Sequence, residues 1–216
     1  MDLRNKKINF LCDSITKGSG IRDVYTEILR KRYCLSQANN YGIGGTRIAP
    51  KKIPSEDPIY DEDFCSRVDT MEKDADIVVV FGGTNDYGHG DAPIGNVNDT
   101  ASDTFCGACH VLFQSVKRRF PKSKILILTP LHRINENISR GADHTGEPKP
   151  ALEVYANAIL EIAQGYDVSV LDLFHTEILD PRDPYVREKY VPDGLHPNDD
   201  GHVVLADCIG AALEAL

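Results

Sequence analysis

The chain of 216 residues has no run of about 20 apolar residues, which is the length that a membrane-spanning helix requires. It also has no cluster of Lys and Arg of the kind that neutralises nucleic-acid phosphates, and its formal net charge is −9. These absences predict a protein with no membrane partner and no nucleic-acid partner. On charge alone, the sequence is compatible with a small neutral or cationic ligand.

The N-terminus lacks the features of a secretion signal. The stretch MDLRNKKINFLCDS has basic residues but only a short apolar run, and no small-residue cleavage site follows it. We therefore expect a first strand here and a cytoplasmic protein. In that compartment cysteines are expected to be reduced thiols. The six cysteines are Cys12, Cys34, Cys65, Cys106, Cys109 and Cys208.

Several cofactor and hydrolase signatures are also missing. The glycine-rich stretches at 42–45 and 82–83 have neither the Gly-Lys-Ser/Thr of a P-loop nor a G-x-G-x-x-G spacing. The Gly-x-Ser-x-Gly turn of α/β-hydrolases is absent as well. The pentapeptide CGACH (106–110) formally matches a haem-attachment signature, but it lies in an amphipathic helical pattern, and a zinc site would need two further ligands. We predict no metal and no cofactor.

What the chain does have is the composition of a folded globular protein. Its hydrophobic fraction of 41% is too high for a disordered chain, and its length fits one domain better than two. We expect a single domain over residues 1–216.

Three short runs rich in β-branched and apolar residues predict strands that are buried on both faces of a parallel sheet. These runs are KINFLC (7–12), DIVVVF (76–81) and KILILT (124–129), and weaker candidates lie at 35–41 and 167–172. Amphipathic helical patterns cover 21–33, 103–120, 152–162 and 203–213. The alternation of strands and helices predicts an α/β fold, a three-layer α/β/α sandwich around a five-stranded parallel sheet.

Ligands of such sheets bind outside the carboxyl ends of the strands, so the segments that follow the strands are where chemistry is expected. These segments are DSITKGSG (13–20), NYGIGGTR (40–47), GGTNDYGHG (82–90) and the long polar stretch 130–150. The Pro-rich stretch 48–63 predicts an irregular surface excursion within the domain.

Two segments carry candidate catalytic groups. Ser14 stands where the first apolar run stops, and a strand that delivers a hydroxyl to its exposed end is one way to build a nucleophile. Asp193 and His196 are three residues apart in a turn-rich segment, a spacing that can bring a carboxylate to the Nδ1 side of an imidazole. Each segment alone also fits an ordinary structural turn.

Together, four segments resemble a known family in order and spacing. The segments DSIT (13–16), NYGIGG (40–45), GGTND (82–86) and DGLH (193–196) are similar to the four sequence blocks of the SGNH hydrolases, also called GDSL esterases. The resemblance extends from residue 8 to about residue 205. It implies the flavodoxin-like sandwich that the periodicity also predicts.

The resemblance also implies roles for single residues. Ser14 matches the nucleophile, and Asp193 and His196 match the acid and the base. Gly45 and Asn85 match the residues that complete the oxyanion hole together with the Ser14 N–H. One position departs from the family pattern, because Cys12 stands where the family usually has Gly. If that backbone angle were one that only Gly adopts easily, Ser14 would be misaimed.

These groups suit ester hydrolysis on physical grounds. A serine hydroxyl becomes nucleophilic when a neutral imidazole accepts its proton, and a carboxylate on the other ring nitrogen fixes the tautomer. We therefore expect a metal-independent serine esterase that removes short acyl groups, above all acetyl, from a small or carbohydrate-like substrate. The short-acyl preference follows from the resemblance and from the lack of an apolar lid segment. One wall of the substrate site is expected from loop 132–150, which contains Arg133, Arg140 and His144.

Two alternatives stay open. Because of Cys12, the chain could be a catalytically inactive binding protein for acylated carbohydrate on the same fold. In the other alternative, the glycine-rich loops hold a nucleotide or flavin. The oligomeric state is also open, a homo-oligomer included.

Overall fold

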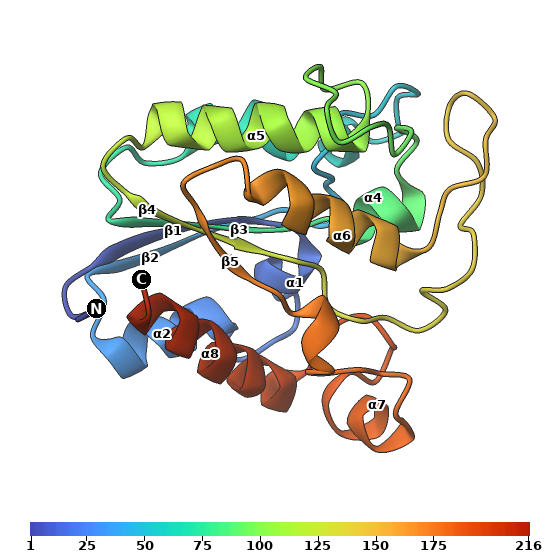
Figure 1. Cartoon of the computed structure of the whole chain (residues 1–216). Coiled ribbons are helices and arrows are strands. Elements are labelled where there is room, and N and C mark those ends of the chain that lie inside the picture. The colour runs from blue at the N-terminus through green and yellow to red at the C-terminus, as the bar shows by residue number, and fades with distance from the viewer.

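A computed structural model describes all 216 residues of the chain (Figure 1). Five parallel strands form one sheet in the order β2-β1-β3-β4-β5. The strands are β1 (Lys7–Cys12), β2 (Gln37–Gly42), β3 (Ile77–Phe81), β4 (Lys124–Leu128) and β5 (Ser169–Leu171). This is the strand order of flavodoxin-like doubly wound sheets, and the expected α/β fold with a five-stranded parallel sheet is confirmed.

The sheet is the middle layer because its central strands are apolar on both sides. Successive side chains of a strand point to opposite faces, and in β3 Val78 and Val80 join one hydrophobic core while Ile77 and Val79 join the other. Helices cover the two faces in pairs, α5 (Phe105–Arg119) with α6 (Leu152–Ala163) and α2 (Tyr25–Tyr33) with α8 (Asp199–Glu214) (Figure 1).

These four longer helices are the ones that the amphipathic patterns predict, with shifts at their ends. Helix α2 begins at Tyr25 and not at residue 21, because residues 21–24 dock on the start of α8. There the N–H of Arg22 donates to Asp199 Oδ1 at 2.8 Å, and the N–H of Tyr25 donates to His202 Nδ1 at 3.3 Å. None of the helices combines the length and the apolar character that crossing a bilayer demands.

Several short helices are not predicted by periodicity, because helices of four to seven residues are too short to display it. They are α1 (Ser14–Lys17), α3 (Phe64–Arg67), α4 (Thr84–His89) and α7 (Pro184–Tyr190), with 3₁₀ turns at Pro58–Asp61, Val68–Thr70 and Phe174–Thr176. Helices α1 and α4 begin just after β1 and β3. They place two candidate residues, Ser14 and Asn85, in a first helical turn at the carboxyl edge of the sheet.

The two edge strands are the ones that the sequence identifies least clearly. Strand β5 has only three residues, half the length of the candidate run 167–172, and its Val170 is 37% exposed. Strand β2 is polar and has no fully buried residue. An edge strand has less of its surface covered, so its sequence carries a weaker apolar signal.

Candidate active site

Ser14 lies at the end of the most buried part of the sheet. Strand β1 ends at Cys12, and the carboxylate of Asp13 then accepts the N–H of Ile15 at 3.0 Å and caps α1. Ser14 is the first residue of that helix. The helix can approach β2 because Gly42 has no side chain, since a Cβ there would lie 2.4 Å from the backbone nitrogen of Lys17.

Cys12 occupies the family's usual glycine position without a backbone penalty. It is fully buried and is not among the residues with positive φ. Its carbonyl oxygen accepts the N–H of Ile43 at 3.2 Å and Nη2 of Arg67 at 2.9 Å. The local backbone is therefore one that a cysteine adopts readily, and it does not misdirect Ser14.

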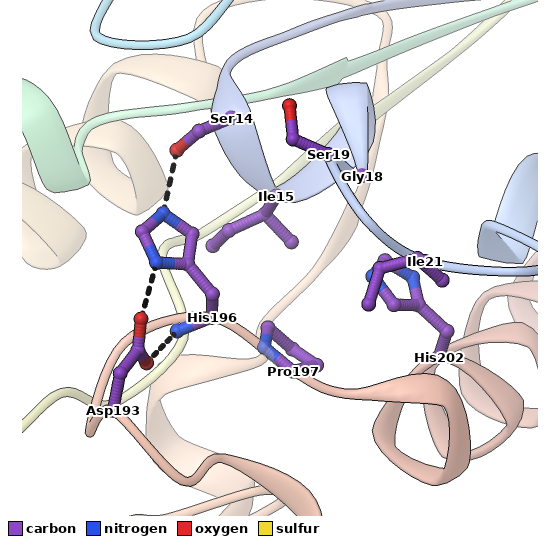
Figure 2. A pocket seen from close by; sticks show the side chains of 9 residues that line it. All are labelled: Ser14, Ile15, Gly18, Ser19, Ile21, Asp193, His196, Pro197 and His202. Carbon is purple, nitrogen blue, oxygen red and sulfur yellow. Dashed lines mark hydrogen bonds and ion pairs between the residues drawn. The ribbon is translucent and has the colours of Figure 1, made fainter.

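The structure brings Ser14, His196 and Asp193 into one hydrogen-bonded chain, although the first two are 182 residues apart (Figure 2). Ser14 Oγ is 3.0 Å from His196 Nε2, and His196 Nδ1 is 2.7 Å from Asp193 Oδ2. The side chains of His196 and Asp193 are 43% and 54% exposed. The three groups therefore lie at the surface, where a substrate can reach them.

The loop that carries Asp193 and His196 is held by its own backbone. Asp193 Oδ1 accepts the N–H groups of Leu195 and His196 at 2.8 and 2.7 Å. Gly194 supplies the positive φ of 79° that this tight turn needs. Burial alone would raise the pKa of Asp193, but these hydrogen bonds and the His196 imidazole outweigh it and lower the pKa below 3.8. The carboxylate of Asp193 is thus ionised at neutral pH.

Gly45 and Asn85 reach the same edge because their strands end in register. Cys12 pairs with Gly42 of β2 on one side and with Phe81 of β3 on the other, so the loops after β1, β2 and β3 start side by side. Asn85 Nδ2 donates to the Thr46 carbonyl oxygen at 2.9 Å and joins two of these loops. The N–H of Gly45 has no acceptor within the protein.

The second loop passes beside Ser14, and its backbone favours glycine at position 45. A Cβ on Gly44 would lie in ordinary contact with Ser14 Cβ, at 3.8 Å, whereas Gly45 has a φ of 76° that other residues rarely adopt. A Cβ on Gly45 would lie 3.0 Å from the ring of Tyr60, which is 48% exposed. Backbone N–H groups in this loop can therefore approach a bound carbonyl without obstruction.

Two buried charged residues that the sequence does not mark hold these loops. Arg67 is 4% exposed and donates to Thr46 Oγ1 at 2.7 Å as well as to the carbonyl oxygens of Cys12 and Tyr41. Asp86 accepts the N–H groups of residues 48 and 49 at 3.0 and 2.9 Å, and burial raises its pKa to about 6. Nothing local identifies Arg67, whereas Asp86 directly follows Asn85 and could have been found from that position.

A pocket of about 220 Å³ opens beside Ser14 and His196. Figure 2 shows Ile15, Ile21 and His202 along its length, with the imidazole of His196 between Ser14 and Asp193. The lining is mostly polar or small, and only two of its nine residues are hydrophobic. The pocket is thus small and its lining mainly polar, unlike a channel for a long acyl chain.

The cysteines of the CGACH segment lie away from this site. Cys106 and Cys109 are buried in the core on helix α5, and burial raises the pKa of both thiols, that of Cys106 to about 11. No group of three or more His, Cys, Asp or Glu side chains lies together in a way that could hold a metal ion. These cysteines act as small apolar residues in the core.

Comparison with solved structures identifies proteins of the same fold. A Lactobacillus plantarum protein is 28% identical, with a TM-score of 0.82 and 98% of each chain covered. A possible lipase from Chitinophaga pinensis is 21% identical, with a TM-score of 0.70, 97% of this chain covered and 98% of the other. The acetyl xylan esterase AlAXEase is 22% identical, with a TM-score of 0.64 and coverage of 95% and 98%. The last two similarities concern the fold alone.

A comparison with curated proteins found no match. A family model described as the GDSL-like lipase/acylhydrolase family matches residues 10–204, a span that includes all four sequence blocks. Because the match covers most of the chain, the protein belongs to the GDSL-like lipase/acylhydrolase family.

Proposed function

We propose that the protein is a serine esterase that hydrolyses short-chain carboxylic esters, above all acetyl esters, through an acyl-enzyme. The observation that carries the proposal is the contact of 3.0 Å between Ser14 Oγ and His196 Nε2, with Asp193 on the other ring nitrogen. In this arrangement Asp193 accepts the Nδ1–H of His196. Nε2 is then the free base that faces the Ser14 hydroxyl.

In the first half of the reaction, Ser14 Oγ attacks the ester carbonyl carbon while its proton passes to His196 Nε2. The carbonyl oxygen becomes an oxyanion, which we assign to the N–H groups of Ser14 and Gly45 and the side-chain amide of Asn85. Each such donor typically contributes about 2.7 to 4 kcal/mol in the transition state. The imidazolium then gives its proton to the departing alcohol, and the acyl group stays on Ser14.

In the second half, water replaces the alcohol. His196 Nε2 takes a proton from the water, the resulting hydroxide attacks the acyl carbon, and the proton returns to Ser14 Oγ as the carboxylic acid leaves. The negative charge of Asp193 stabilises the imidazolium in both halves. Its lowered pKa supports this role, because the carboxylate does not compete for the proton.

The preference for short acyl groups and a polar alcohol is supported by the pocket and by Tyr60. A space of about 220 Å³ with few hydrophobic residues suits an acetyl group better than a long chain. The exposed ring of Tyr60 beside Gly45 offers a flat surface to the alcohol half, as aromatic residues do at carbohydrate sites. An acetyl xylan esterase of this fold has such a substrate, an acetylated carbohydrate.

The test is a hydrolysis screen with p-nitrophenyl esters of graded length and acetylated sugars, run with the wild type and Ser14→Ala. We expect the variant to lose about 10⁴-fold or more in kcat while its far-UV spectrum and melting temperature stay the same. Ser36→Ala, an exposed serine just before β2 and so at the opposite end of the sheet, is the matched control and should retain activity. Unchanged hydrolysis by Ser14→Ala would refute the mechanism.

A further inference from the structure

Arg133, five residues beyond β4, is a buried arginine without a carboxylate partner. Its residue exposure is 8%, and no ion pair of the chain includes it. Its only side-chain hydrogen bonds run from Nη1 to the carbonyl oxygen and Oγ1 of Thr84, at 3.1 and 3.2 Å. Because a guanidinium stays charged in proteins, a buried one is normally paired with an anion.

One edge of this guanidinium is free. Nε and Nη2 of Arg133 donate to no protein group, and neither is among the buried polar atoms that are closed off without a partner. The two N–H bonds on this edge of a guanidinium are parallel, which is the geometry that binds both oxygens of a carboxylate. Arg133 can therefore take up an anion from outside the protein.

Arg133 lies between the loop that carries Asn85 and the loop that carries Asp193 and His196. Thr84, which holds Nη1, directly precedes Asn85. On the other side, the N–H of Ile134 donates to the carbonyl oxygen of Gly194 at 2.9 Å, next to Asp193. An anion on the free edge of Arg133 would thus belong to a molecule that also reaches the ester-cleaving groups.

The loop after β4 fixes Arg133 in place before any ligand binds. Glu136 is 1% exposed and accepts the backbone N–H of Arg133 at 2.8 Å, and it also binds His132 and Arg182 at 2.9 and 2.7 Å. The ring of Tyr87 lies 5.4 Å from Cζ of Arg133. A donor held in this way loses little conformational entropy on binding.

Further positive charges lie near Arg133, and they make few close ion pairs. Lys149 is 4% exposed and donates to two carbonyl oxygens of the α4 region, at 2.9 and 2.8 Å, without any ion pair. Arg47 is 1% exposed, and its one ion-pair partner, Asp61, is 3.9 Å away. The nearby carboxylate of Asp86 is occupied by backbone N–H groups.

We propose that Arg133 binds a carboxylate of the substrate, so that the natural ester carries an acidic group on its acyl or its alcohol half. This inference rests on the proposed esterase function and names its substrate class. Arg133 acts here as a specificity-determining residue, and Lys149 and Arg47 strengthen the local field that attracts the anion.

The experiment compares charged and neutral esters in matched pairs. An acidic alcohol half is represented by 3-acetoxybenzoate against 3-acetoxybenzamide, and an acidic acyl half by monoethyl succinate against ethyl pentanoate. Each is assayed by acid release at low ionic strength with the wild type, Arg133→Gln, Arg133→Lys and the surface control Arg118→Gln. The ratio of variant to wild type for each ester cancels the intrinsic reactivity of that ester.

We expect Arg133→Gln to lower kcat/KM for at least one of the two charged esters by about tenfold or more, chiefly through KM. Its neutral partner should change by less than about threefold. Arg133→Lys should recover part of the difference, because it restores the charge without the paired donors. Arg118→Gln removes the same charge from an exposed helix position and should change no ratio.

Equal losses for charged and neutral esters in Arg133→Gln would show that the residue only supports α4, and would overturn the inference. The inference would also be overturned if the wild type hydrolyses the neutral esters but Arg133→Gln lowers kcat/KM no more for the charged than for the neutral ester in either pair. That result would leave the esterase function intact. A wild type that hydrolyses none of the four esters would overturn the proposed function and this inference with it.

Discussion

Arg67 holds the carbonyl oxygen of Cys12 at 2.9 Å and thereby anchors the residue at which β1 ends, two positions before Ser14. The same guanidinium binds Tyr41 in β2 and Thr46 beside Gly45. A single buried cation thus sets the spacing between Ser14 and the loop that we assign to the oxyanion. The alignment of these two strand ends depends on a side chain from a third element, α3.

Replacement of Arg67 by Met should therefore lower both stability and activity. It removes three buried hydrogen bonds at once, those to the carbonyl oxygens of Cys12 and Tyr41 and to the hydroxyl of Thr46, which we expect to cost about 2 to 4 kcal/mol in the free energy of unfolding. Urea unfolding measures this loss, and Arg118→Met is the exposed control. A variant that unfolds at the wild-type urea concentration would contradict the anchoring role.

Replacement of Asn85 by Ala should lower kcat by about 10²- to 10³-fold with little change in KM, because the amide acts on charge that develops only in the transition state. Asn85→Asp keeps the shape but puts a negative charge beside the oxyanion, so it should be at least as impaired. Steady-state kinetics on p-nitrophenyl acetate measure both. If Asn85→Ala retained kcat within about threefold of the wild type, the amide would have no part in the oxyanion hole.

Replacement of Asp193 by Asn should lower kcat by about 10²- to 10⁴-fold. An amide that donates to Nδ1 of His196 leaves the proton on Nε2, and Nε2 can then no longer accept the proton of Ser14. The measurement is kcat on an acetyl ester across pH. Asp200→Asn, an exposed change in the first turn of α8, is the control and should leave kcat unchanged.

His202 makes the folded state sensitive to acid. It is 1% exposed, Nδ1 accepts the N–H of Tyr25, and burial lowers the pKa of the imidazole from 6.5 to about 4. Between those two pH values the unfolded chain binds a proton that the folded chain does not. The free energy of unfolding therefore contains a contribution from His202 that is complete above pH 6.5 and is lost as the pH falls towards 4.

The variant His202→Asn keeps an acceptor for the N–H of Tyr25 but cannot titrate. We expect the wild type to exceed the variant in stability by more at pH 7 than at about pH 4.5, as measured by urea midpoints. Asp13 and Asp86, whose pKa values burial raises to about 6, act in the opposite direction, but they do so in both proteins and cancel in the comparison. Parallel pH profiles for the two proteins would contradict this account.

The sequence predicts what local pattern or spacing determines. Strands such as 77–81 can be recognised in the sequence because burial on both faces requires an uninterrupted apolar run. The four blocks can be recognised because tight turns and hydrogen-bond donors require particular residues at particular positions. The short helices that begin at Ser14 and Thr84 are not predicted, because tertiary contacts and not periodicity stabilise them.

Buried charged residues are the other part that sequence reasoning could not place. Arg and Lys are residue types that usually lie at the surface. Only the fold shows that Arg67 and Lys149 are buried and donate to carbonyl oxygens. The net charge of −9 indicates neutral or cationic ligands, yet Arg133, Lys149 and Arg47 lie close enough together to lower the pKa of the same residue, His89. A sum over the whole chain does not describe the field in one cleft.

The placement of Ser14 just after β1 and of His196 just before α8 has a consequence for folding. The two side chains meet only when segments 182 residues apart dock at the same edge of the sheet. A partly folded chain in which α8 has not yet docked therefore has its sheet and its serine hydroxyl but lacks the contact between Ser14 and His196.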